Sequence, residues 1–109
     1  MTAKHGLNAS VLEQITAVLA QFPQVEKAVL FGSRAKGIHK RGSDIDLALI
    51  GRDLTWQILG SIEFAFDDLP IPHRFSLIMF NERTDPDVAA HIRRVGIPLF
   101  QKHAVVAER

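Results

Sequence analysis

Four residues in two short motifs could carry out chemistry on phosphates. Gly32 and Ser33 follow one apolar run, and Asp44 and Asp46 open the next one after a short basic loop. Two carboxylates two positions apart on a strand share a face, with Cα atoms roughly 6 to 7 Å apart. Mg²⁺ is a hard ion that takes carboxylates together with phosphate oxygens and water. The spacing therefore predicts a Mg²⁺ site at Asp44 and Asp46 that a nucleoside triphosphate completes, as in phosphoryl transfer.

The Gly32-Ser33 turn would supply the other half of such a site. Glycine lets the backbone approach a phosphate closely, and the Ser33 hydroxyl and the amides after it can donate to phosphate oxygens. A short helix beginning at residues 33–37 would strengthen that anion site. By itself a Gly-Ser turn is usually only a turn, and an Asp-x-Asp pair is usually a solvated strand edge. Their occurrence together, each at a strand boundary, favours the functional interpretation.

Basic side chains between the motifs are further candidates for phosphate contact. Arg34 and Lys36 follow the turn directly, and three more come before the second motif: His39, Lys40 and Arg41. A basic loop is also commonly just solvated, so both roles stay open. The other histidines have no spacing typical of a zinc site, and we expect them to be structural or surface residues: His5, His73, His91 and His103.

Hydrophobic periodicity places the motifs on predicted elements. Ser10 and Glu13 form a capping box before an apolar pattern that predicts a helix over about 11–22. Residues 28–31 predict a strand buried on both faces, and residues 44–50 predict the strand that carries the aspartates. In this second strand three apolar residues point one way, so both aspartates share the other face: Ile45, Leu47 and Leu49.

The second half of the chain predicts a helix, a strand, a helix and a short strand. The first helix covers about 54–68, and Trp56, Gly60 and Phe64 lie beside its main apolar stripe, where the fold covers them or they form an apolar patch for another protein. Residues 75–80 predict the third strand. The last two elements are a helix bracketed by Asp85, Pro86 and Gly96, and an edge strand over 97–100.

Composition limits the class of protein. A chain of 109 residues predicts one domain over 1–109, because two cores would each be too small. Apolar residues at 47% and charged residues at 23% are typical of a globular protein, and no apolar stretch predicts a membrane span. A net charge of +1 argues against general nucleic-acid binding. The absence of cysteine and of a signal-like N-terminus predicts a cytoplasmic location.

The order of the two motifs resembles a known family. Gly32-Ser33, ten residues, then Asp44-Ile45-Asp46 is similar to the signature of the minimal nucleotidyltransferases of the DNA polymerase β superfamily, and residues 69–100 resemble its closing elements. The resemblance implies an α/β (α+β) fold, a small mixed sheet with helices packed on one side. It implies that Gly32 and Ser33 bind the nucleotide, to which the basic residues after the turn add Arg34 and Lys36 as candidates. Asp44 and Asp46 would be the catalytic residues and the ligands of two Mg²⁺ ions.

One position departs from that family pattern. The family usually places a third carboxylate on the next strand, where this chain has Ser76. A two-metal mechanism holds its ions about 3.5 to 4 Å apart and needs negative charge that serine does not supply. Asp67, Asp68 or a partner's carboxylate could substitute. Catalysis is therefore less secure than nucleotide binding, and Ser76→Asp is expected to raise the transfer rate.

The resemblance implies a specific function. It suggests transfer of a nucleoside monophosphate, AMP from ATP or the equivalent from another NTP, to a hydroxyl of a protein or other macromolecule. Stand-alone domains of this size in the family are often the antitoxin of a toxin-antitoxin pair, so the resemblance also implies a HEPN-type toxin as the partner that is modified. The alternative is a catalytically weak or inactive nucleotide-binding module that neutralises its partner by contact.

Other enzyme classes are less well supported, and a homo-oligomer stays open. A small-molecule nucleotidyltransferase would need an added acceptor domain for which the chain has little room. Kinase and dinucleotide-binding folds are excluded at the motif level, because the chain has no Gly-Lys-Ser/Thr loop and no Gly-x-Gly-x-x-Gly turn.

Overall fold

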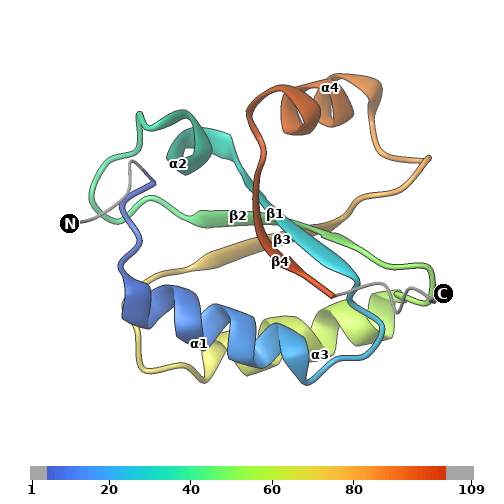
Figure 1. Ribbon diagram of the computed structural model, residues 1–109, viewed down its shortest axis with the longest axis horizontal. Helices are drawn as coiled ribbons and strands as arrows, with labels where there is room; N and C mark the ends of the chain where they lie inside the picture. The colour runs from blue at the N-terminus through green and yellow to red at the C-terminus, as the bar shows by residue number, and fades with distance from the viewer. Residues whose placement is uncertain (1–4, 103–109) are drawn as a thin grey trace, which may run out of the picture.

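Four strands form one mixed sheet at the centre of the computed structural model, which describes residues 5–102 (Figure 1). The elements are α1 (Ala9–Ala20), β1 (Lys27–Phe31), α2 (Gly32–Lys36), β2 (Ile45–Ile50), α3 (Trp56–Asp67), β3 (Phe75–Met79), α4 (Pro86–Val95) and β4 (Ile97–Gln101). The strand order is β3-β2-β1-β4. β1 pairs antiparallel with β2 and β4, and β2 pairs parallel with β3 through the α3 crossover.

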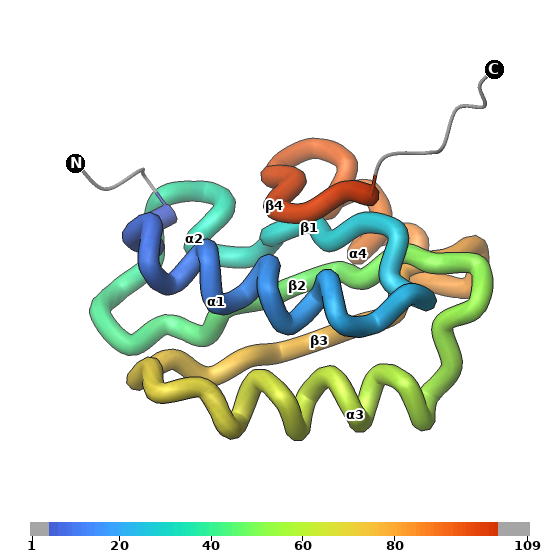
Figure 2. The backbone as a smooth tube through the Cα atoms, turned by 60° about the horizontal axis from the view of Figure 1, so that its bottom comes forward, coloured from blue at the N-terminus to red at the C-terminus, as the bar shows by residue number. Residues whose placement is uncertain are grey.

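The two faces of the sheet carry two apolar clusters. Ile45, Leu47 and Leu49 of β2 point into the larger cluster, which α1 and α3 cover. Figure 2 shows these two helices side by side across that face, and they contact each other. Ala48 points the other way into the smaller cluster with Ile92 of α4. The predicted alternation in β2 is therefore confirmed, and it leaves Asp46 on the face of α4.

The mixed sheet is confirmed, but the expectation that the helices pack on one side is wrong for α4. α1 and α3 lie on one face and α4 lies on the other (Figure 1). The reason is that the second face is also apolar, with Val29 of β1 and Ala48 of β2. Burying these side chains needs a second layer, which α4 supplies through Ile92.

The helix boundaries follow from their capping residues. α1 begins earlier than predicted, because Asn8 is the N-cap and its Oδ1 accepts from the Val11 N–H at 2.9 Å. Ser10 therefore lies inside the first turn and is not the cap. The hydroxyl of Thr55 caps α3, and Asp85 caps α4 before Pro86, as predicted. The short helix considered for residues 33–37 exists as α2, which begins one residue earlier and includes Gly32 and Ser33.

A ridge of residues on the outer face of α3 remains uncovered within residues 5–102. This aromatic ridge consists of Trp56, Gly60 and Phe64, which recur every fourth residue and so lie on one helix face. The side chains of Trp56 and Phe64 are 73% and 78% exposed. A Cβ at Gly60 would meet nothing within 4 Å. Of the two roles considered for these residues, the structure excludes burial by the described part of the fold.

No helix between residues 5 and 102 combines the length and apolar character needed to cross a membrane.

Candidate active site

The antiparallel pairing of β1 with β2 brings the two motifs together. The C-terminal end of β1 lies beside the N-terminal end of β2, where Phe31 pairs with Asp46. Gly32 follows Phe31 directly, so the Gly-Ser turn lies beside the Asp46 carboxylate. The loop after α2 connects the two motifs and returns the chain to the start of β2.

Gly32 is required at this turn for two reasons. Its φ of +75° lies in the left-handed region, which disfavours side chains. A Cβ built on Gly32 would overlap the carboxylate of Asp46. The backbone of the turn therefore lies against the acidic motif, and a triphosphate bound at Gly32 and Ser33 would lie next to a cation held by Asp46.

The two aspartates differ in their environment. Asp44 is exposed immediately before β2, while Asp46 is half-buried within it. Burial raises the pKa of the Asp46 carboxyl, and the nearby Asp44 carboxylate raises it further, against the opposing effects of Arg34 and His91. A divalent cation stabilises the ionised form of two neighbouring carboxyl groups, which otherwise disfavour each other's ionisation. Carboxylate oxygens are also ligands that Mg²⁺ prefers. The pair therefore fits a Mg²⁺ ion.

Ser76 lies where the third carboxylate was expected. In the parallel register between β2 and β3, Ser76 pairs with Asp46, and its side chain is exposed. Within the described range 5–102, no group of three or more His, Cys, Asp or Glu residues could hold a metal ion. Asp67 and Asp68, which end the helix on the other face, therefore do not complete the site. Asp44 and Asp46 are therefore the carboxylates that the described residues offer to a metal ion here.

The structure corrects the expectation that Arg34 contacts the nucleotide directly. Its side chain is 3% exposed. The guanidinium donates through Nε to the Ser43 carbonyl at 3.1 Å and through an Nη atom to the His5 carbonyl at 2.9 Å. Arg34 therefore ties the end of the connecting loop, next to Asp44, to the N-terminal segment. Lys36 is exposed and remains a candidate for phosphate contact.

Three histidines surround the buried guanidinium of Arg34. Burial lowers the pKa values of His5 and His73, and the charge of Arg34 lowers both further. His39 comes from the connecting loop and approaches Gly6 so closely that a Cβ there would overlap its Nε2. These contacts fix the loop on the N-terminal segment. They favour a structural role for His39, while Lys40 and Arg41 are exposed.

His91 of α4 is a site residue that sequence reasoning missed. Its Nε2 accepts a hydrogen bond from the Gly32 N–H at 3.2 Å. Its ring meets the Phe31 ring edge-on, with centroids 6.2 Å apart. Nothing local in the sequence signals this contact, because 59 positions separate the two partners.

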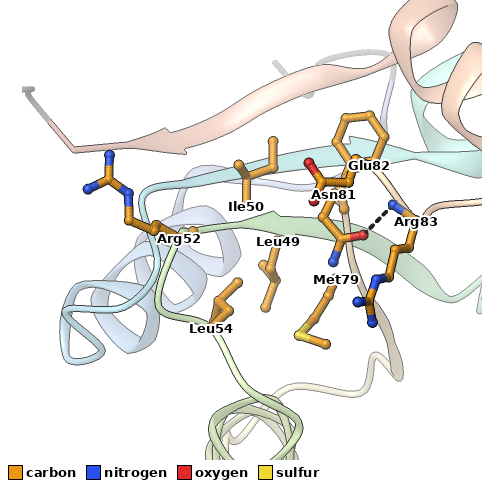
Figure 3. Close-up of a pocket in the computed structure, with 10 residues that line it drawn as sticks. Leu49, Ile50, Arg52, Leu54, Met79, Asn81, Glu82 and Arg83 are labelled. Carbon is orange, nitrogen blue, oxygen red and sulfur yellow. Dashed lines mark hydrogen bonds between the residues drawn. The ribbon is translucent and has the colours of Figure 1, made fainter.

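A pocket of about 520 Å³ lies away from this site, at the other end of β2 (Figure 3). Leu49, Leu54 and Met79 form part of its apolar lining, and Arg52 and Arg83 lie at opposite sides. The Arg83 N–H donates to the Asn81 side chain at 2.8 Å. The Gly-Ser turn and both aspartates lie outside this pocket, so it is not the candidate active site.

A mixed sheet that holds a Gly-Ser turn against an Asp-x-Asp motif defines a small nucleotidyltransferase core. The family model for polymerase beta nucleotidyltransferases matches residues 13–104, and the chain belongs to this family. The resemblance inferred from the motifs is thus confirmed.

Individual relatives are similar over most of the chain. The probable protein adenylyltransferase MntA of Haemophilus influenzae is 29% identical over 105 residues, which cover 95% of this chain and 91% of that protein. The fold is similar to that of a toxin-antitoxin crystal structure with AMP-PNP, with a TM-score of 0.59, 23% identity, and coverage of 84% of this chain and 74% of the other. It is also similar to a structure of a tri-AMPylated Shewanella oneidensis HEPN toxin in complex with an MNT antitoxin, with a TM-score of 0.52, 20% identity, and coverage of 84% and 70%.

Proposed function

We propose that this chain is a Mg²⁺-dependent nucleotidyltransferase that transfers AMP from ATP to a hydroxyl group of a partner protein. The observation that carries the proposal is the contact between Gly32 and Asp46, which joins a phosphate-binding turn to a carboxylate pair. The name of the Haemophilus relative, a probable protein adenylyltransferase, supports the same chemistry.

Each group in the site has a role in this reaction. Gly32 and Ser33 bind the triphosphate, and Lys36 adds positive charge from the exposed side of α2. Asp44 and Asp46 hold Mg²⁺, which when bound neutralises charge on the phosphates. The acceptor oxygen forms a bond to the α-phosphorus as the bond to pyrophosphate breaks, and the acceptor proton passes to solvent. Because the site is open at Asp44, a protein side chain can reach it.

We further propose a HEPN-type toxin as the partner, with this chain as its antitoxin in the cytoplasm. The support comes from similarity to chains in toxin-antitoxin complexes, one of which contains an AMPylated HEPN toxin. The aromatic ridge of α3 offers the partner an apolar contact of two exposed rings. The ridge lies on the sheet face opposite Asp46. A partner bound at the ridge would therefore not cover the active site.

Ser76 favours a second candidate function. Without a third carboxylate, the chain could bind nucleotide and partner but transfer AMP slowly or not at all. Such a module would neutralise its partner by contact alone.

One experiment separates the two candidates. The HEPN-type protein that co-purifies with this chain is weighed as an intact protein before and after incubation with Mg²⁺ and ATP. A gain of whole AMP units, absent with the Asp44→Asn/Asp46→Asn double variant, is the result expected of the transferase. A stable complex without any mass gain would contradict transfer and support neutralisation by contact.

A further inference from the structure

His91 lies where α4, the Gly-Ser turn and β2 meet. Its Nε2 accepts from the N–H of Gly32 at 3.2 Å, and Phe31 packs against the ring at an interplanar angle of 81°. Gly32, to which the ring is hydrogen-bonded, lies directly against the Asp46 carboxylate. The side chain is half-buried, so it is neither free in solvent nor part of the apolar core.

The hydrogen bond meets a specific need of the turn. Gly32 is the first residue of α2, and the first four N–H groups of a helix have no partner within it. Gly32 also has no side chain with which to anchor itself. Because its backbone lies against Asp46, a small movement would change the distance between the phosphate-binding turn and the acidic motif.

Packing against the sheet places α4 to make this contact. Ile92 packs with Val29 and Ala48 on the sheet. Gly96 lies so close to the sheet that an added Cβ would approach Val29. The neighbouring His91 is thereby presented to the Gly-Ser turn by a buried anchor, and its position does not depend on a loop.

We propose that His91 is a positioning residue of the nucleotide site, which holds the Gly32 amide so that the Gly-Ser turn and Asp46 stay in register. This inference rests on the proposed nucleotide site at Gly32 and Ser33. To accept from an N–H, Nε2 carries no proton, so the imidazole is the neutral Nδ1–H tautomer. α4 then acts as a wall of the active site in addition to covering the sheet.

Calorimetric titration with Mg²⁺ and AMP-PNP tests the proposal on the full chain. His91→Leu removes the acceptor and should weaken binding roughly five- to tenfold, the usual size of one hydrogen bond. His91→Gln places an acceptor oxygen near the Nε2 position and should bind within about twofold of the wild type. Arg94→Ala, an exposed position on the same helix, is the matched control and should bind as the wild type does.

A ligand-free measurement separates positioning from simple packing. Hydrogen exchange of the Gly32 amide should accelerate in His91→Leu and stay slow in His91→Gln, with similar melting temperatures for both. Wild-type affinity in His91→Leu would overturn the inference while leaving the nucleotide site intact. Failure of the wild type itself to bind AMP-PNP would instead contradict the proposed function, and the inference with it. If His91→Leu does not fold, equal affinities of His91→Gln and the shorter His91→Asn would overturn the inference.

Discussion

Replacing Ser76 by aspartate should restore a third carboxylate beside Asp46. The two residues pair in the parallel register, and neighbouring strands about 4.8 Å apart place the carboxylates roughly 5 Å from each other. At that separation like charges repel by about 0.8 kcal/mol in water and about 3 kcal/mol at an effective dielectric constant of 20. Because Ser76 is exposed, the lower figure applies. We expect Ser76→Asp to lower the free energy of unfolding by about 1 kcal/mol without Mg²⁺.

Mg²⁺ should reverse this loss, since a cation between the carboxylates turns repulsion into attraction. Urea unfolding with and without Mg²⁺ measures the effect, and Ser76→Asn is the matched control without the added charge. Transfer of AMP to the partner, followed by intact mass, should be faster for Ser76→Asp than for the wild type. The control should show neither the Mg²⁺-dependent stabilisation nor the faster transfer.

Two results together would refute this reasoning. If Ser76→Asp gained no stability from Mg²⁺ beyond that of Ser76→Asn, the new carboxylate would not reach the ion. If the transfer rate also stayed unchanged, the absence of a third carboxylate would not be what limits this enzyme.

Four further outcomes follow from the described contacts. Gly32→Ala should abolish AMP-PNP binding and cost about 1 to 2 kcal/mol or more of stability, because alanine disfavours the left-handed backbone and its Cβ overlaps Asp46; calorimetry and urea unfolding test both. Arg34→Met should cost about 2 kcal/mol in urea unfolding, because two carbonyls lose a charged donor while a buried charge is also removed. Because the pKa of His5 is lowered in the folded state, the unfolded chain binds more protons than the folded chain as the pH falls below about 6.5. The urea midpoint of unfolding should therefore fall when the pH is lowered from about 8 to about 5.5, and it should fall less in His5→Asn. Trp56→Ala should weaken association with the HEPN-type partner in sedimentation experiments without altering the melting temperature, and unchanged association would argue against the aromatic ridge as the contact.

Local patterns in the sequence predicted the four strands and the three longer helices, with errors at some boundaries. The alternation of Ile45, Leu47 and Leu49 with Asp46 required one apolar face, so the acidic residue had to lie on the other. Asp85 and Pro86 marked the start of α4, because capping depends on a few adjacent residues. The expectation for α1 failed by two positions because Asn8 and Ser10 are both good caps, and the helix begins at the first of them.

The sequence by itself determined which residues are candidates for binding phosphate and metal, because turn chemistry and strand periodicity are local properties. Only the tertiary structure decided how distant segments complete the site. The register between β2 and β3 placed Ser76 beside Asp46, and folding buried Arg34 against the carbonyls of His5 and Ser43. The second apolar face of the sheet drew α4 onto it and brought His91 to the Gly32 amide. Such contacts arise from burial and pairing across the whole chain, which the residues adjacent to a motif do not encode.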